Sequence, residues 1–247
     1  MSAPQLEVRR AAARARTRTD WLDSSHCFSF GRHYDPTDTH HGLLLVSNDD
    51  VVLPGAGFAT HPHRDMEIVT WVVQGSLAHQ DSTGHAGVVH PGLAQRMSAG
   101  SGIAHSERNE AQVPVRFVQM WVPPDDTGGA PGYEQRELGD ARLREGLVPV
   151  AAGAGRYAGE RAVSIGQRDA ALLAARLAPA QVVRLPDAAY VHVFVTTGSV
   201  RLEGAGAADV ATLCAGDAVR LTGGGGHRLE ALSESEVLVW EMHASLQ

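Results

Sequence analysis

Residues 54–63 are Pro54-Gly55-Ala56-Gly57-Phe58-Ala59-Thr60-His61-Pro62-His63, a glycine-rich turn followed by a short segment that ends on two histidines. In a β-strand, residues two apart point to the same face, so His61 and His63 would project together as a two-pronged ligand. A glycine-rich turn before such a segment suits a strand that enters a small closed barrel. This stretch therefore predicts a barrel strand that carries two imidazoles on one face.

A second pair of ligand-type residues follows the same pattern. Residues 100–107 are Gly100-Ser101-Gly102-Ile103-Ala104-His105-Ser106-Glu107, so His105 and Glu107 would also share one strand face. With 13 histidines in 247 residues, about 0.7 His-x-His pairs are expected by chance, and neither pair alone is specific. Two such pairs, each behind a glycine-rich turn, predict a metal site inside a barrel, held by His61, His63, His105 and Glu107.

The donor set indicates which metals the site would hold. Three neutral imidazoles and one carboxylate leave open positions in an octahedral shell, which favours Fe(II), with Mn, Co or Ni as alternatives. Zinc accepts the same donors but prefers four ligands, and this would close the site and give it a structural role. Open positions would admit water or a substrate.

The other histidines are expected to have ordinary roles. Ten of the 13 lie between residues 26 and 105. His79 and His85 flank residues 81–84, whose Asp, Ser, Thr and Gly are typical of a hairpin turn, and both are expected at the surface. His192 and His227 have no ligand-type neighbour two residues away, so we expect no metal in the second half of the chain.

The pattern along the chain predicts a mainly β fold in two parts. Residues 42–46, 68–73, 115–122, 190–196 and 237–240 are short, rich in β-branched or aromatic residues, and bounded by turn formers. Residues 169–177 are the clearest helical candidate, with a strand as the alternative. A proline- and glycine-rich stretch at 123–132 predicts a linker, and the strand-turn pattern recurs on either side of it. We expect two all-β barrels, in domains 1–125 and 126–247.

Composition excludes several classes of protein. The net charge of −7 gives no general attraction to nucleic acid or to an anionic membrane. The arginines at 9, 10, 14, 16 and 18 suggest a nucleic-acid arm, a transit peptide or, as we favour, solvated charge ahead of the first domain. No apolar run is long enough to span a bilayer, which predicts a cytoplasmic protein. Cys27 and Cys214 are expected to be buried free thiols.

Several further segments of the chain form a recognisable pattern with the two ligand pairs. They are Trp21-Leu22-Asp23-Ser24-Ser25-His26, Phe28-Ser29-Phe30-Gly31, Tyr34-Asp35-Pro36, Asn48-Asp49-Asp50, Phe58, residues 61–68, Gly75, Gln80-Asp81-Ser82, residues 97–107 and Tyr133-Glu134-Gln135-Arg136. Together these residues resemble the pirin family of the cupin superfamily, in particular its bacterial members. The resemblance covers nearly the whole first domain, and the chain departs from the family's common residues at His33, Leu45, His85 and Leu93.

The resemblance implies a bicupin, two tandem double-stranded β-helix (jelly-roll) barrels. It implies iron in the N-terminal barrel on His61, His63, His105 and Glu107, and a C-terminal barrel without metal. Some members of the family are quercetin 2,3-dioxygenases, which act on a flavonol and dioxygen. Others resemble redox-sensitive regulators that bind transcription factors or metabolic enzymes.

Three functions therefore stay open at this point. The first is a metal-dependent dioxygenase acting on a small flavonol-like aromatic, with Glu107 as the catalytic base that accepts a proton from a substrate hydroxyl. The second is a regulatory protein that binds a protein partner and whose surface responds to the oxidation state of iron. The third is a metal-stabilised β-protein that performs no chemistry.

Overall fold

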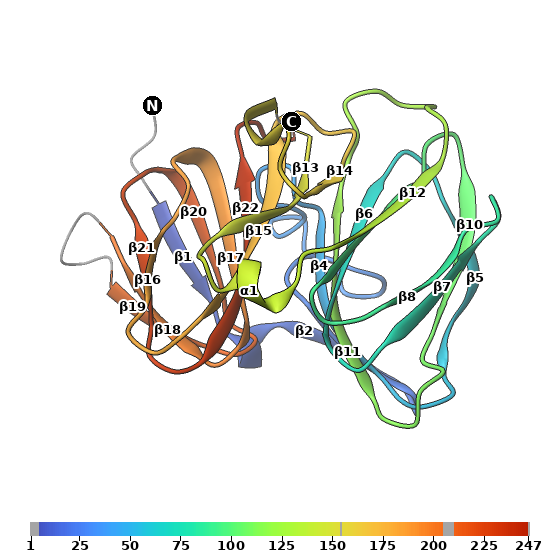
Figure 1. Ribbon diagram of the computed structural model, residues 1–247, viewed down its shortest axis with the longest axis horizontal. Coiled ribbons are helices and arrows are strands. Elements are labelled where there is room, and N and C mark those ends of the chain that lie inside the picture. The colour runs from blue at the N-terminus through green and yellow to red at the C-terminus, as the bar shows by residue number, and fades with distance from the viewer. Residues whose placement is uncertain (1–4, 154, 205–209, 247) are drawn as a thin grey trace.

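A computed structural model of the protein describes residues 5–153, 155–204 and 210–246. Two β-barrels lie side by side, and the predicted all-β, two-barrel fold is confirmed (Figure 1). Each barrel consists of one seven-stranded and one four-stranded sheet. The helical elements in the described part of the chain are short: α1 (Asp140–Leu143) and two 3-10 turns, η1 (Ala11–Ala13) and η2 (Gly155–Tyr157). No helix among those residues is long and apolar enough to cross a membrane.

The first barrel is built from residues on both sides of the 123–132 stretch. Its seven-stranded sheet runs in the order β12 (Gly132–Glu137), β9 (Leu93–Ser98), β6 (Glu67–Gln74), β11 (Val115–Val122), β4 (Val46–Val52), β3 (Leu22–His26) and β2 (Ala15–Arg18). Its four-stranded sheet runs in the order β5 (Gly57–His63), β10 (Ile103–Arg108), β7 (Leu77–Asp81) and β8 (Ala86–Val89).

The second barrel has the same two-sheet organisation. Its seven-stranded sheet runs in the order β1 (Gln5–Arg9), β20 (Ala218–Gly224), β17 (Ala188–Thr197), β22 (Ser235–Met242), β15 (Ala170–Leu177), β13 (Val148–Ala152) and β14 (Val163–Ser164). Its four-stranded sheet runs in the order β16 (Val182–Arg184), β21 (Arg228–Ala231), β18 (Ser199–Glu203) and β19 (Val210–Cys214).

Two strands pair with the barrel that lies on the other side of the predicted domain boundary at residue 125. The N-terminal strand β1 pairs with β20 of the second barrel, from Gln5 opposite Thr222 to Arg9 opposite Ala218. It is the blue strand among the orange ones in Figure 1. Conversely, β12 follows the linker in sequence but pairs with β9 of the first barrel. The barrels therefore do not coincide with the ranges 1–125 and 126–247 at these two strands. Each of the two strands pairs at a free edge of a sheet in the other barrel.

A shared core joins the two seven-stranded sheets. It includes Trp71 and Val118 from the first barrel and Leu172, Phe194 and Trp240 from the second, all buried. Polar contacts also cross this core. The Trp71 indole N–H donates to Glu236 Oε1 at 2.9 Å, and the Trp240 indole N–H lies 3.2 Å from Met120 Sδ.

This packing explains why residues 169–177 form a strand and not the helix that their alanines and leucines suggested. Strand β15 is buried on both faces. Leu172 and Ala174 face the shared core, whereas Leu173 and Ala175 face the interior of the second barrel. A strand buried on both faces is apolar throughout, so the alternation that identifies a strand is lost.

We expect Trp71→Ala to lower the free energy of unfolding by about 3–5 kcal/mol, because it removes a large buried side chain between the barrels. Trp71 is 0% exposed. Chemical denaturation followed by circular dichroism measures the change. The control is Val88→Ala, at a position that is 53% exposed, which should change stability by less than about 0.5 kcal/mol. Equal stability of the two variants would contradict the proposed role of the shared core.

Other local predictions have mixed outcomes. The strands predicted at 68–73, 115–122, 190–196 and 237–240 are confirmed as parts of β6, β11, β17 and β22. The strand predicted at 42–46 is wrong, because His41 and Leu44 close a tight bridge there and β4 begins only at Val46. Cys27 is buried as expected, whereas Cys214 is exposed on β19.

The arginine-rich N-terminal segment is not merely solvated charge. Arg10 forms an ion pair with Asp217 of the second barrel at 2.8 Å. Arg14 forms one with Asp49 of the first at 3.2 Å, and its side chain is only 5% exposed. The expectation of solvated charge is therefore wrong at Arg14, whereas the side chain of Arg10 is 52% exposed although it is paired.

The interiors of the two barrels differ in chemistry. The second is filled by a continuous aliphatic cluster that includes Val193, Val200 and Leu229. In the first, the apolar side chains form two smaller clusters, one around Phe117 and one around Ile68. Polar side chains and histidines occupy the remaining space, so the first barrel is the one that can hold a site.

Candidate metal centre

Strands β5 and β10 place the predicted ligands next to one another. The two strands are antiparallel, with His105 directly opposite His61 and Ile103 opposite His63. A bulge between His105 and Glu107 shifts the register, so that Glu107 lies opposite Phe58. Gly57 permits this close approach, because a Cβ there would lie 2.2 Å from Glu107 O.

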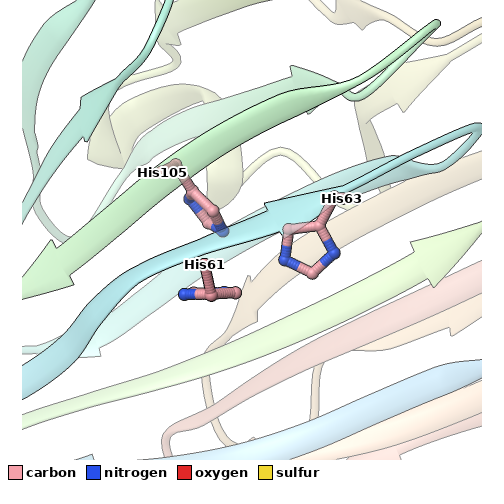
Figure 2. Close-up of side chains that lie close together, drawn as sticks. All are labelled: His61, His63 and His105. Carbon is pink, nitrogen blue, oxygen red and sulfur yellow. The ribbon is translucent and has the colours of Figure 1, made fainter.

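Three of the four predicted ligands converge. The side-chain nitrogens of His61, His63 and His105 that could bind a metal lie within 4.8 Å of one another. Figure 2 shows the three imidazoles gathered beside the two neighbouring strands. The ring centroids of His61 and His105 are 4.5 Å apart, and those of His63 and His105 are 5.0 Å apart.

Hydrogen bonding leaves the Nε2 atoms of this group available. His61 Nδ1 lies 2.8 Å from Ala59 O, and since a carbonyl oxygen only accepts, Nδ1 carries the proton and Nε2 has a free lone pair. The Nε2 atoms of His63 and His105 are buried and have no hydrogen-bond partner among the described residues. Buried polar atoms are normally satisfied, so these two orphaned nitrogens fit a bound metal ion.

The electrostatics of the pocket also favour metal-binding imidazoles. Burial, reinforced by the neighbouring His61, lowers the pKa of His63 to about 4 and that of His105 to about 3. Both rings are therefore neutral at physiological pH, which is the form that binds a metal.

Glu107 is close to this group but has a different set of neighbours. Its carboxylate is grouped with His105 and His79, and not with His61 and His63, among the donors that lie within 4.8 Å of one another. The Gln119 amide donates to both of its oxygens, at 3.0 and 2.8 Å. Burial raises the pKa of Glu107 to about 7, although the hydrogen bond from Gln119 opposes the shift. A carboxyl group with a pKa near neutrality is suited to proton transfer.

His79 was expected at the surface, and this prediction is wrong. It is 3% exposed, and its Nδ1 lies 3.5 Å from His105 Nδ1. Its Nε2 lies 3.4 Å from Asp81 Oδ2. Although burial opposes it, hydrogen bonds from Thr83 and His85 lower the pKa of Asp81, so its carboxylate accepts the proton of His79 Nε2. Nδ1 of His79 then accepts from His105 Nδ1, which leaves His105 Nε2 free to bind a metal.

We expect His79→Leu to weaken metal binding about ten- to hundredfold, because the variant cannot accept the hydrogen bond that orients His105. His79→Gln is the matched variant, since its amide oxygen can still accept, and it should lie closer to the wild type. Competition with a chelator of known affinity measures both. Equal losses in the two variants would show that His79 acts through packing alone.

A cavity of about 400 Å³ opens beside the histidine group. Its wall includes His61, His63 and Glu107 together with four aromatic side chains, Trp21, Phe30, Phe58 and Trp121. The rings of His63 and Trp121 meet edge to face, with centroids 4.9 Å apart. This volume and lining are in the range of small-molecule sites, which are mostly apolar with a few fixed polar groups.

The sequence did not identify as site residues several polar side chains of this region, among them Asn48, Asp50 and Gln119. All three line the cavity from the sheet opposite the histidines. A signal was present, because Asn48 and Asp50 are two apart and therefore share one face of strand β4. A polar pair at such positions in a buried strand indicates a site.

The fold and the histidine group define a bicupin whose first barrel contains residues that could hold a metal ion. Comparison with known proteins then gives the family. The family model described as Pirin matches residues 7–122. With a relative that is 55% identical over 98% of the chain, this shows that the protein belongs to the pirin family.

The relatives differ in how much of the chain they cover. That relative, from Mycobacterium tuberculosis, is named "Putative quercetin 2,3-dioxygenase" and matches over 242 residues and 96% of its own length. The Escherichia coli protein named "Quercetin 2,3-dioxygenase" is 46% identical over 134 residues, which are 54% of this chain and 58% of that protein.

Solved structures agree with the fold. YhhW from Escherichia coli superimposes with a TM-score of 0.87 at 32% identity, covering 98% of this chain and 100% of that one. A second structure is of the bacterial pirin YhhW in complex with nickel(II), with a TM-score of 0.86 and 32% identity. It covers 97% of this chain and 100% of the other.

Proposed function

We propose that this protein is a metal-dependent dioxygenase that acts on a flavonol such as quercetin. One observation carries the proposal: a group of three imidazoles with unpartnered nitrogens at the wall of an aromatic-lined cavity of about 400 Å³. The names of the relatives in Mycobacterium tuberculosis and Escherichia coli support the same substrate class.

The proposed ligands are His61, His63, His105 and Glu107, and the proposed ion is Fe(II), with Mn, Ni, Co or Zn as other ions that the donor set accepts. A bound divalent ion would supply Lewis-acid polarisation and orient a substrate oxygen. Glu107 would accept the proton of the reacting hydroxyl, since burial raises its pKa to about 7. The Gln119 amide, which donates to both Glu107 oxygens, would hold the carboxyl group in place.

The aromatic side chains would bind the flat substrate and exclude water. Trp21 and Phe58 meet edge to face with centroids 5.2 Å apart, as do Phe30 and Trp121 at 5.7 Å. These rings offer an apolar surface on which an aromatic substrate can pack.

The test is oxygen consumption with quercetin by protein loaded separately with iron, manganese, nickel, cobalt or zinc. Turnover above that of metal-stripped protein is expected with at least one ion, and the ranking of the ions identifies the metal. Absence of turnover with every ion, in protein that has bound the metal, would rule the proposal out.

A redox-responsive regulatory role is the second candidate, and one feature of β4 favours it. Asp50 faces the cavity, whereas the adjacent Asp49 faces the second barrel and pairs with Arg116 at 2.8 Å and with Arg14 at 3.2 Å. A change of charge in the cavity could bias these ion pairs through a single strand, and with them the hydrogen bond that Arg116 donates to Thr196 O of the second barrel at 2.8 Å. Hydrogen exchange of ferrous and ferric protein tests this role, and identical protection of β2 and β4 in the two states would count against it.

A further inference from the structure

The sheet that faces the histidines contributes several polar side chains to the cavity. His61, His63, His105 and Glu107 come from β5 and β10 of the four-stranded sheet of the first barrel. Ser24, Asn48, Asp50 and Gln119 come from β3, β4 and β11 of the seven-stranded sheet, and all of them line the same cavity. A molecule held between the two sheets therefore meets polar groups on both sides.

Most of these opposing polar groups already have partners within the protein. The Gln119 amide donates to Glu107, and Gln119 Oε1 accepts from the Trp121 indole at 3.1 Å. Asn48 Oδ1 lies 2.9 Å from His26 Nδ1. These pairs fix the shape of the wall and occupy the acceptor oxygens of Gln119 and Asn48.

Asp50 is the exception. Its side chain is buried, with the residue 5% exposed, and its Oδ1 has no hydrogen-bond partner among the described residues. Within the cavity wall it shares this condition with His63 Nε2, which a metal ion would satisfy. The described arginines form no ion pair with Asp50, although the adjacent Asp49 has two.

A buried carboxyl group with an unsatisfied oxygen is costly for folding. Leaving a buried acceptor without a partner costs about 1–3 kcal/mol, and more when the group is charged. Burial raises the pKa of Asp50 to about 7, partly offset by a hydrogen bond from Ser24, and the charges of Asp49 and Glu107 raise it further. Stability alone would favour an apolar residue here, so a bound molecule is the physical explanation for the carboxyl group.

We propose that Asp50 is a substrate-recognition residue whose Oδ1 accepts a hydrogen bond from a second hydroxyl of the aromatic substrate. The first hydroxyl, the reacting one, would face the histidine group and Glu107, which lie on the sheet opposite Asp50. This inference rests on the proposed function and narrows its substrate class to aromatic compounds with at least two hydroxyls. A substrate that has only the reacting hydroxyl leaves the Asp50 oxygen unsatisfied.

Binding of two flavonols to nickel-loaded protein without oxygen tests the proposal without relying on turnover. Quercetin has several hydroxyls, whereas 3-hydroxyflavone has only the reacting one. Absorption titrations would compare wild type, Asp50→Val and Asp50→Asn. We expect Asp50→Val to weaken quercetin binding about ten- to hundredfold and to change 3-hydroxyflavone binding less than about threefold. Asp50→Asn, which keeps an acceptor oxygen, should give an intermediate loss for quercetin.

The possible outcomes separate this inference from the function on which it rests. In one outcome, wild type binds both flavonols while Asp50→Val weakens the binding of both equally or leaves the binding of both unchanged. Either result overturns the recognition role of Asp50, while the proposed function stands. If wild type loaded in turn with iron, manganese, nickel, cobalt and zinc binds neither flavonol with any of them, the proposed function fails and the inference fails with it. Thermal unfolding of both variants controls for folding, and Asp50→Val should be at least as stable as wild type because it removes the unsatisfied carboxyl group.

Discussion

Protein with His105→Ala should bind less than stoichiometric metal, with an affinity more than about a hundredfold below that of wild type. A group that only orients a ligand typically contributes ten- to hundredfold, so removal of a donor itself should cost more. His105 belongs to both groups of potential donors in this region, which makes it the most sensitive position. Elemental analysis after dialysis against a weak chelator, together with competition titrations, measures the loss.

His192→Ala is the matched control for this prediction. His192 is a buried histidine of the second barrel, and its Nε2 also has no hydrogen-bond partner among the described residues. Both variants remove a buried imidazole, but only His105→Ala should lose metal. In addition, metal at 100 times its Kd should stabilise wild type and His192→Ala by about 2.7 kcal/mol, and His105→Ala by much less. Full metal content in His105→Ala would refute the assignment of the site.

Glu107→Gln should reduce flavonol turnover by about 10²- to 10⁴-fold while the flavonol still binds. The substitution preserves the size of the side chain but removes the group that accepts the substrate proton, and general-base catalysis typically contributes this much. Steady-state oxygen consumption gives the loss of turnover, and an oxygen-free absorption titration gives the affinity. A variant that turns over at the wild-type rate would exclude Glu107 as the base.

The same substitution should alter the pH dependence of metal binding. Below the pKa of Glu107, which burial raises to about 7, the carboxyl group holds a proton that a metal must displace. Protonation of Glu107 therefore lowers the apparent metal affinity by up to about tenfold for each pH unit below 7. Above pH 7 the carboxyl group is ionised and this effect disappears. Between pH 5.5 and 7, the slope of the logarithm of metal affinity against pH should be smaller in Glu107→Gln than in wild type, by about one proton released per metal bound.

Glu67→Gln is the control for both effects of Glu107→Gln. Glu67 is another buried glutamate of the first barrel, but it accepts a hydrogen bond from Ser98 at 2.8 Å and does not line the cavity. Its replacement should leave both turnover and the pH slope of metal binding unchanged. If Glu67→Gln changes them as much as Glu107→Gln does, the effects arise from general perturbation of the barrel.

The predicted ligands illustrate what local sequence can establish. Spacing by two on a strand is a local property, so the sequence alone was sufficient to pair His61 with His63 and His105 with Glu107. The glycine at position 57 was also informative, because only a residue without a side chain allows β5 to approach β10 at the bulge. The convergence of the three histidines follows once the two strands are neighbours.

Residues whose role depends on a distant strand were harder to find. His79 appeared to be a turn residue, yet β7 pairs with β10 and brings it against His105. Asp50 and Gln119 become part of the cavity only because the seven-stranded sheet closes over the four-stranded one. No short segment encodes which sheet faces which.

The sequence by itself determined the all-β class, the two-barrel organisation and the residues proposed as ligands, because strand periodicity and ligand spacing are written in consecutive residues. The tertiary structure alone decided that β1 joins the second barrel, that β15 is a strand buried on both faces, and that Asp50 lies opposite the histidines. These features depend on pairing and burial between segments far apart in the chain, where the partner, and not the local pattern, sets the environment.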